Sequence, residues 1–294
     1  SAPGTATQTI YVGVADKSNN VFRSTDGGVT WTAIPGQPAG YIPHHGVLSA
    51  NGDLYISYID GAGPYRGEKG AVWKLDTATG VWTDVSPLKS NDPDLHFGFG
   101  GLTVDAQNPD TVMVASLNAW WPDEQIYRST NGGETWSPIW EWDGYPSRKL
   151  KYKQDISAAP WLDFGSHPVP PETTPKLGWM IGDLEIDPFD SDRMMYGTGA
   201  TLYGSDNVTN WDEPNGKIDI SVMAMGIEET YVRDLVSPPA GAPLISALAD
   251  VSGFRHAQLD AVPARMHLNP SNSFSLDYAE LDPGFIVRAG GVDT

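Results

Sequence analysis

Short runs of alternating apolar and polar residues recur along the chain, separated by turns rich in glycine, proline, asparagine and aspartate. A period of two residues is the pattern of a β-strand with one buried face, and helical periodicity is scarce. The pattern therefore predicts an all-β protein built from many short strands.

A turn sequence repeats within this pattern. The segment RSTDGGVTW (23–31) returns almost unchanged as RSTNGGETW (128–136), and weaker copies are KLDTATGVW (74–82) and YGSDNVTNW (203–211). In such a turn the Asp or Asn side chain accepts backbone hydrogen bonds, the glycine pair supplies positive φ angles, and the Trp packs back between sheets. The repeat resembles the Asp-box of bacterial-neuraminidase-type repeats, which marks β-propeller blades and is structural.

Aligning the copies predicts four-stranded β-propeller blades, with strands A to D numbered from the inner to the outer edge. The best blade has its strands at 101–105, 111–116, 125–129 and 136–140. Further blades are predicted over 45–85 and 179–211, followed by A and B strands at 231–237 and 243–249. The chain opens on a B strand (9–15) and ends after an A strand (275–279) and a B strand (285–289), so we expect a segment of a longer protein.

The composition narrows the classes of function. With 37 acidic and 18 basic residues the formal charge is -19, which disfavours nucleic acid and anionic membranes as partners. Cysteine is absent, which excludes a disulfide framework and thiolate metal sites, and no apolar run is long enough to span a membrane. The 11 Trp and 12 Tyr residues suit a protein that offers aromatic faces to a ligand.

Propeller topology predicts which loops carry chemistry. The C–D turns, which hold the Asp-boxes, emerge on one face, and the B–C and D–A loops emerge on the other, where ligands usually bind. The predicted B–C loops are 16–20, 59–70, 117–124 and 249–253, and the D–A loops include 36–45 and 143–178.

Aromatic residues collect in these loops. Trp120 and Trp121 form a pair that no strand interior requires, and exposed aromatic rings stack on the flat faces of sugars. The alternative to ligand contact is that one of the two rings packs between blades and has a structural role. Further candidates for ligand contact, for each of which ordinary loop packing is an equal explanation, are Tyr41, His44, His45, Tyr65 and Arg66.

Several carboxylates are candidates for acid–base chemistry. Asp250 directly follows a B strand, and we expect its partial burial on the ligand face, where a carboxylic acid can keep its proton as a general acid must. A capping role in the turn is the alternative, and Asp60 is the corresponding residue of another B–C loop.

Two further acidic groups are ambiguous. Asp183, Glu185 and Asp187 alternate on an A strand and fit either a metal site or the polar lining of a central channel, and Glu228 and Glu229 precede another A strand. No recognised metal, phosphate-binding or nucleophile motif is present, so we expect no metal and no cofactor.

Long specific segments resemble glycoside hydrolase family 74, the xyloglucanases and related xyloglucan-active glucanases. They are 43–52 (PHHGVLSANG), 99–109 (FGGLTVDAQNP), 118–124 (NAWWPDE), 155–161 (DISAAPW), 178–188 (GWMIGDLEIDP), 194–200 (MMYGTGA) and 226–229 (GIEE). The resemblance implies two seven-bladed propellers with the glucan between them. Residues 1–218 would be later blades of the first propeller and 219–294 the first blades of the second, with the crossover near 215–227.

The resemblance also implies a secreted enzyme that hydrolyses β-1,4-glucosidic bonds with inversion, using two aspartates. Asp250, in LADVSGF, matches the general acid, although Ser252 stands where glycine is common in the family. The general base lies in an N-terminal segment resembling Arg-Thr-Asp-Ile-Gly-Gly, which this sequence lacks, so the missing N-terminal blades are an expected partner. The rival hypothesis is a non-catalytic propeller that binds carbohydrate or protein, and a sialidase is disfavoured because arginines are few on the ligand face.

Overall fold

The computed structural model describes residues 4–63, 65–227 and 230–291. Within these ranges its regular secondary structure consists of β-strands joined by turns and loops, with two short 3-10 helices, η1 (Pro160–Asp163) and η2 (Val208–Asp212). Neither of these helices is long and apolar enough to cross a membrane. The chain forms two compact units, which are described separately. Unit 1 contains the residues up to Lys153, Pro170–Glu172 and Lys176–Ile220, and unit 2 contains Gln154–Val169, Thr173–Pro175 and the residues from Ser221 onward.

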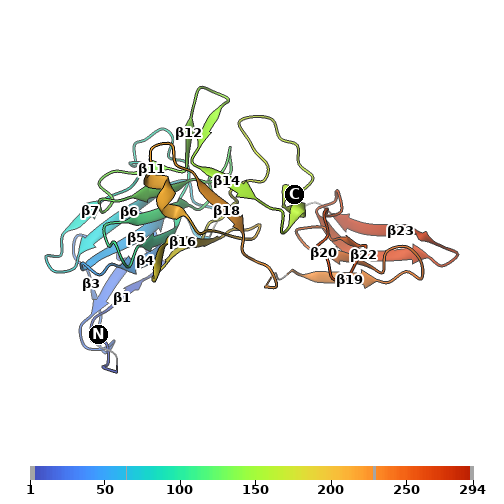
Figure 1. Cartoon of the computed structure of the whole chain (residues 1–294). Coiled ribbons are helices and arrows are strands. Elements are labelled where there is room, and N and C mark those ends of the chain that lie inside the picture. The colour runs from blue at the N-terminus through green and yellow to red at the C-terminus, as the bar shows by residue number, and fades with distance from the viewer. Residues whose placement is uncertain (1–3, 64, 228–229, 292–294) are drawn as a thin grey trace. The chain divides into compact units, whose positions relative to one another are not determined.

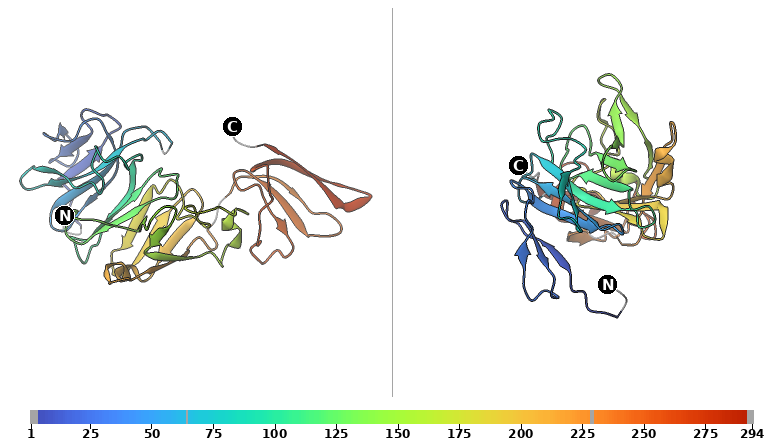
Figure 2. Two further views of the ribbon diagram at one scale, coloured as in Figure 1. Left: turned by 90° about the horizontal axis from the view of Figure 1, so that it is seen from above. Right: turned by 90° about the vertical axis from the view of Figure 1, so that its left-hand side faces the viewer.

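The sheets of unit 1 follow one another in chain order, as the left view of Figure 2 shows from blue through green to yellow. The first is β1 (Ile10–Gly13), β2 (Val21–Ser24) and β3 (Thr32–Ala33). The second is β4 (Ile42–Leu48), β5 (Asp53–Ile59), β6 (Gly70–Asp76) and β7 (Trp82–Asp84). The third is β8 (Phe99–Val104), β9 (Val112–Ser116), β10 (Ile126–Ser129) and β11 (Ser137–Pro138). Neighbours in each sheet pair antiparallel in sequence order, as predicted for strands A to D.

A hairpin and a five-stranded sheet follow. The hairpin, drawn at the top of Figure 1, consists of β12 (Trp140–Trp142) and β13 (Arg148–Leu150). The sheet has the order β14-β18-β17-β16-β15. Its strands are β14 (Tyr152–Asp155), β15 (Asp183–Asp187), β16 (Asp190–Gly197), β17 (Leu202–Ser205) and β18 (Ile218–Val222).

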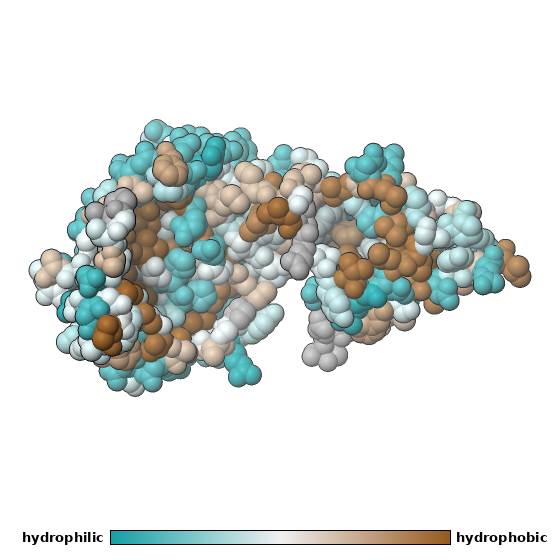
Figure 3. Space-filling model, turned by 90° about the horizontal axis from the view of Figure 1, so that it is seen from below, coloured by the Kyte–Doolittle hydropathy of each residue, from teal (hydrophilic) through white to brown (hydrophobic). Residues whose placement is uncertain are grey.

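Unit 2 contains one three-stranded and one two-stranded sheet among its described residues. They are formed by β19 (Val232–Val236), β20 (Leu244–Leu248) and β21 (Arg255–His256), and by β22 (Asn272–Ala279) and β23 (Asp282–Gly291). Ala242, Ile245, Ala247 and Leu276 form a buried cluster between the two sheets. Apolar residues also lie at the surface of each unit, brown in Figure 3.

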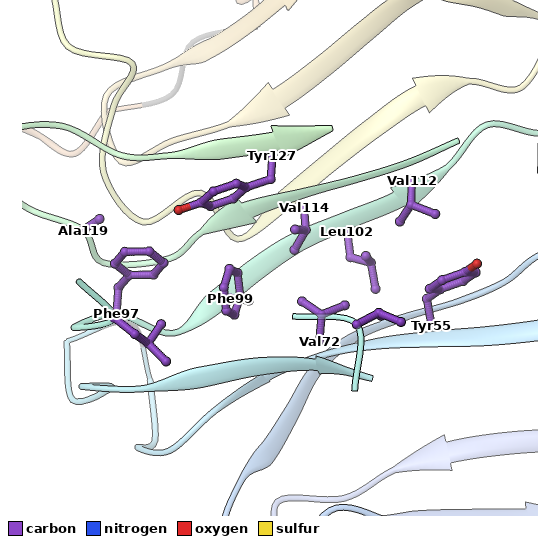
Figure 4. Packing of buried hydrophobic residues seen from close by; sticks show 11 residues of the cluster. Tyr55, Val72, Phe97, Phe99, Leu102, Val112, Val114, Ala119 and Tyr127 are labelled. Atoms are coloured by element: carbon purple, nitrogen blue, oxygen red, sulfur yellow. The ribbon is translucent and has the colours of Figure 1, made fainter. Parts of the chain in front are cut away.

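The core of unit 1 lies between consecutive blades. In β5, Leu54, Ile56 and Tyr58 pack toward the first sheet, whereas Tyr55 packs with residues of the third. Successive side chains of a strand point to opposite faces, so a strand between two blades is apolar on both. Figure 4 shows the second of these clusters, in which Phe99 and Leu102 of β8 lie with Val114 of β9.

The Asp-box turns adopt the predicted geometry. The Asp26 carboxylate accepts hydrogen bonds from the Thr30 amide (2.9 Å) and hydroxyl (2.6 Å), and these bonds lower the pKa of Asp26 to about 2. Gly27 and Gly28 have φ angles of 73° and 94°, in the left-handed region that glycine favours. In the second full copy Asn131 Oδ1 accepts from the Thr135 amide (3.0 Å), and the Asn131 side-chain amide donates to Thr135 Oγ1 (2.9 Å).

The tryptophans of three copies join successive blades, as predicted. The indole N–H of Trp82 donates to Pro35 O, that of Trp136 to Val85 O, and that of Trp211 to Ser137 Oγ. Each acceptor lies at the end of the preceding blade. The Trp31 indole instead donates to Gly28 O within its own turn.

Two predicted strand limits are wrong. The D strand predicted over 136–140 ends at Pro138, and Trp140 opens the separate hairpin that turns through Gly144 (φ 77°). The blade predicted over 179–211 does not end at Trp211, because residues Val208–Asp212 form η2 there. The strand next to β17 is β18, further along the chain.

Candidate functional site

Two buried carboxylates hold the B–C loop of the third blade in place. Asp123 accepts hydrogen bonds from the amides of Glu124 (2.9 Å) and Leu177 (3.0 Å). Glu124 accepts from the amides of Ala119 (3.0 Å) and Met180 (3.2 Å), and from the Ser116 hydroxyl. Loop 117–124 is thereby fastened to segment 177–180, and sequence reasoning missed both carboxylates although they lie in the NAWWPDE segment.

Burial dominates the electrostatics of these carboxylates. Desolvation raises the pKa of Asp123 to about 7, against the opposing effect of its amide donors and of Arg148, whose Nη1 lies 3.9 Å from Oδ2. Desolvation likewise raises the pKa of Glu124 to about 8, opposed by its own hydrogen bonds. A charged form in this low-dielectric position is costly, so protons are retained near neutral pH.

Above these anchors, the loops of two adjacent blades meet. The rings of Tyr65, from loop 59–70, and Trp120, from loop 117–124, are stacked with a centroid separation of 6.0 Å and an interplanar angle of 8°. Both rings are solvent-exposed. The Lys176 ammonium donates to Trp120 O (3.1 Å) and to Glu172 (2.7 Å), which fixes the backbone beneath the ring. Exposed aromatic rings of this kind can stack on sugar rings.

Trp121 faces a different set of aromatic residues. Its ring lies 6.1 Å from that of Trp142 in the β12–β13 hairpin, and the Trp142 ring lies 5.9 Å from Tyr145. Trp121 is exposed, as Trp120 is. Neither ring is therefore packed between blades, which was the alternative to ligand contact. Trp142 and Tyr145 were not expected from sequence, because their proximity depends on a hairpin that the strand pattern did not predict.

The remaining candidates of the second blade lie closer to the core than expected. Tyr41 is half-buried and its ring lies 6.3 Å from that of Tyr58, a buried core residue. His44 and His45 belong to the inner strand β4, which begins at Ile42, and not to the loop 36–45 in which they were placed. The register shift between Pro43 and His45 keeps the strand paired past the proline. Arg66 lies exposed in the same loop as Tyr65.

His45 approaches two of the acidic residues of β15. Its Nε2 lies 3.7 Å from Glu185 Oε1, and one possible ligand atom each of His45, Asp183 and Glu185 lie within 4.8 Å of one another. Such a set can hold a divalent cation, but two of its members are exposed, and polar residues on inner strands explain it equally well. Asp187 instead accepts from the Phe189 amide and pairs with Arg193.

In unit 2, Asp250 lies in the tight loop after β20. Its φ angle is 64°, a conformation that is uncommon for residues other than glycine, and its amide donates to Asn272 Oδ1 (2.9 Å). Asp250 is exposed, which corrects the expectation of partial burial, since the described residues of unit 2 leave it at the surface. No hydrogen bond to its carboxylate is found among them. The carboxylate is therefore free to meet a ligand, and the capping alternative finds no support in unit 2.

Asp60 behaves differently from Asp250. Its Oδ1 accepts hydrogen bonds from the amides of Glu68 (2.8 Å) and Lys69 (3.0 Å), which close loop 59–70. The turn-capping role therefore describes Asp60. Glu228 and Glu229 lie outside the described residues.

Arg288 braces the loop that carries Asp250. Its guanidinium donates to Ser252 Oγ, to the carbonyls of Leu268, Asn269 (2.8 Å) and Pro270 (3.1 Å), and to Ser273 Oγ (2.8 Å). Ser252 is fully buried, has a φ angle of 65° and donates to Pro270 O (2.9 Å). Ser252 therefore adopts a left-handed backbone conformation that is unfavourable for a residue other than glycine. The hydrogen bonds of its hydroxyl offset this cost.

Comparison with known proteins agrees with this architecture. The BNR/Asp-box repeat model matches residues 22–33 and 127–138. A xyloglucanase from Paenibacillus sp is 65% identical over 292 residues, covering 99% of this chain and 28% of the relative. Xyloglucanase Xgh74A from Acetivibrio thermocellus is 60% identical over 295 residues, covering 100% of this chain and 35% of the relative. The crystal structure of a GH74 xyloglucanase from Xanthomonas campestris matches with a TM-score of 0.84 and 34% identity, covering 98% of this chain and 38% of that one.

These similarities extend over nearly the whole of the present sequence, although the chain spans only 28% to 38% of the length of the three proteins. The predicted fold class, all-β propeller blades of a two-propeller architecture, is confirmed. Over nearly its whole length the chain is similar to about a third of the length of two xyloglucanases and of a solved GH74 xyloglucanase.

Proposed function

We propose that this chain is the substrate-binding and general-acid portion of an extracellular glycoside hydrolase that cleaves the β-1,4-glucosidic bonds of xyloglucan. The observation that carries the proposal is the similarity of the whole chain, at 65% and 60% identity, to two relatives named xyloglucanase. The exposed rings of Tyr65, Trp120 and Trp121 are suited to stack on a glucan.

Asp250 is the proposed general acid. It lies on a loop after a B strand, its carboxylate is exposed, and its backbone is fixed by Asn272. In an inverting hydrolase the acid protonates the leaving glycosidic oxygen while a second carboxylate activates a water molecule on the opposite face of the sugar. The two carboxyl groups stand roughly 6.5–9.5 Å apart to leave room for that water.

We expect the general base to come from N-terminal blades of the first propeller. These blades belong to the part of the relatives that this chain does not cover. The boundary between the two propellers is proposed to lie at 218/219. Tyr41, His44 and His45 are retained as candidate substrate contacts, with the polar edges of their rings as hydrogen-bonding groups.

The test is an assay of binding and of reducing-end release on xyloglucan and carboxymethyl cellulose. We expect the chain to bind xyloglucan and to release few reducing ends alone, with hydrolysis restored by adding the N-terminal blades of a relative. In that mixture Asp250→Asn should lower the rate by about 10²- to 10⁴-fold, the usual contribution of a general acid. Asp26→Asn, in an Asp-box turn whose second full copy already carries Asn131, is the matched control and should keep the rate.

Two results would contradict the proposal. If Asp250→Asn retains the hydrolytic rate of the unmodified chain, the acid is another residue. If the mixture binds xyloglucan and never hydrolyses it, the chain is a carbohydrate-binding propeller.

A further inference from the structure

Residues 154–169 separate two stretches of unit 1 in the sequence, yet they fold as part of unit 2. The segment contains η1, in which Leu162 is buried, and Ala159 just before η1 is buried as well. Thr174 Oγ1 donates a hydrogen bond to Asp163 O (3.2 Å), at the end of η1. Buried apolar side chains in a connecting segment show that it is packed against other residues and is not a free loop.

Trp161 of this segment contacts the loop that carries Asp250. Its ring centre lies 5.4 Å from that of Phe254, with an interplanar angle of 67°, and 5.9 Å from that of Phe164. Phe254 is buried and Trp161 is half-buried. Aromatic pairs in such edge-to-face arrangements are more stable than the burial of their area alone would make them. Trp161 therefore restrains the ring of Phe254.

Asp250 and Phe254 are the two ends of one short, tightly bonded loop. The Phe254 amide donates to Ser246 Oγ (3.0 Å), and the Phe254 carbonyl accepts from the Ser246 amide (2.9 Å). Between the two ends, the Gly253 amide donates to Val251 O (2.6 Å). A Cβ would not fit at Gly253, because the Ser246 carbonyl oxygen occupies the space. A loop packed this closely moves as a whole, so a shift of Phe254 also displaces Asp250.

The position of a general acid is critical to its action. The acid must reach the leaving oxygen within hydrogen-bond distance, and a misplacement of about 1 Å can cost on the order of 10²-fold in rate. We propose that Trp161 is a positioning residue for the Asp250 general acid and acts through Phe254. The inference rests on the proposed function, which makes Asp250 the acid.

Hydrogen exchange of the chain tests the restraint without substrate. In Trp161→Ala the hydrogen-bonded amides of residues 248–253 should exchange about tenfold faster, while those of β22 and β23 keep their rates, because the lost contact is local. Trp161→Phe keeps an aromatic ring and should exchange like the unmodified chain. Tyr278→Ala is the matched control, since Tyr278 is also a half-buried aromatic residue of unit 2 but lies near the turn of the β22–β23 hairpin. It should leave the exchange of residues 248–253 unchanged.

Kinetics on xyloglucan, in the mixture with the N-terminal blades of a relative, link this restraint to the acid. Trp161→Ala should lower kcat by roughly 10- to 100-fold and leave KM nearly unchanged, and Trp161→Phe should restore most of the rate. Tyr278→Ala should keep the kcat of the unmodified chain. Adding Trp161→Ala to Asp250→Asn should cost little further rate, because residues that act through one group have non-additive effects.

The outcomes separate the inference from the proposed function. If Trp161→Ala keeps the kcat of the unmodified chain while Asp250→Asn loses it, the inference fails and the proposed function stands. Equal acceleration of exchange throughout unit 2, or fully additive losses in the double variant, would show that Trp161 has only a structural role, and either result overturns the inference. If Asp250→Asn keeps the full rate, the proposed acid fails and the inference fails with it, even where residues 248–253 exchange faster in Trp161→Ala.

Discussion

The buried carboxylates of Asp123 and Glu124 show how single residues set the position of an aromatic loop. Each satisfies backbone amides on two segments, residues 119–124 and 177–180, that otherwise would be buried without acceptors. The same burial raises the pKa of both groups, to about 7 and about 8. Their sequence context, a Pro-Asp-Glu in a surface loop, gives no sign of this, because acidic residues in loops are usually solvated.

The raised pKa values make stability depend on pH in a definite direction. Between about pH 4 and pH 8 the folded chain holds protons at Asp123 and Glu124 that the unfolded chain has released. This contribution is fully present below the unfolded pKa values and is lost as pH rises through about 7 and 8. The free energy of unfolding of unit 1 should therefore fall over this range.

Glu124→Gln tests this dependence. The amide side chain cannot accept all three hydrogen bonds that Glu124 accepts, so the variant should be less stable by about 1–3 kcal/mol at pH 5. The difference should shrink by pH 9, because the variant never places a charge in the core. Urea unfolding followed by tryptophan fluorescence reports on unit 1, since every Trp except Trp161 belongs to it. Parallel pH profiles for the variant and the unmodified chain would contradict the prediction, and Glu134→Gln, at an exposed position, is the control.

At the scale of elements, the loop that carries Asp250 depends on the segment before β22. Residues 268–273 receive the hydrogen bonds of Arg288 and Ser252, and Asn272 fixes the Asp250 amide. Asp250 and Ser252 both have left-handed φ angles, and this backbone strain destabilises the loop. The loop keeps this conformation because several hydrogen bonds act together on one short segment.

Substitutions at Ser252 separate these two effects. Ser252→Ala keeps the left-handed strain and loses the hydroxyl bonds, whereas Ser252→Gly loses the same bonds but relieves a strain of about 1–2 kcal/mol. We therefore expect the alanine variant to be the less stable of the two by about 1 kcal/mol. Hydrogen exchange of residues 249–253 and 268–273 measures the opening free energy directly. Faster exchange in the glycine variant than in the alanine variant would show that backbone strain does not matter at this position.

At the scale of the whole molecule, the blades of unit 1 are held together where their inner strands touch. The Gly101 amide of β8 donates to Ile181 O (2.9 Å), and a Cβ at Gly101 would lie 2.7 Å from the Leu184 amide nitrogen and 2.8 Å from the Asp183 carbonyl carbon. Backbone atoms cannot move aside as a flexible side chain can. Glycine is required there by the closeness of two blades, and not by a turn.

Gly101→Ala should consequently separate β8 from β15 and destabilise unit 1 by about 1–3 kcal/mol, the usual cost of overpacking. Calorimetric melting of the variant measures the loss. Gly46→Ala in β4, where the nearest atoms would lie 3.7 and 3.8 Å from the new Cβ, should melt close to the unmodified chain. Equal melting temperatures for the two variants would mean that the inner strands are not closely packed in solution.

The sequence by itself determined the parts of this protein that depend on neighbouring residues. Aligning the repeat copies placed β8 and β9 close to their observed ranges, and the Asp-box turns formed as predicted because an Asp or Asn followed by two glycines satisfies its own backbone. Before Trp211, in the most degenerate copy, the chain forms η2 instead of the predicted turn and strand.

Only the tertiary structure decided the surroundings of the functional side chains. The stack of Tyr65 on Trp120, the contact of Trp121 with Trp142, and the burial of Asp123 and Glu124 all join segments that lie far apart in the chain or have no strand pattern. Such contacts follow from how blades and loops pack against one another. The periodicity of a sequence records which face of a strand is buried, and it carries no information about which distant loop will cover it.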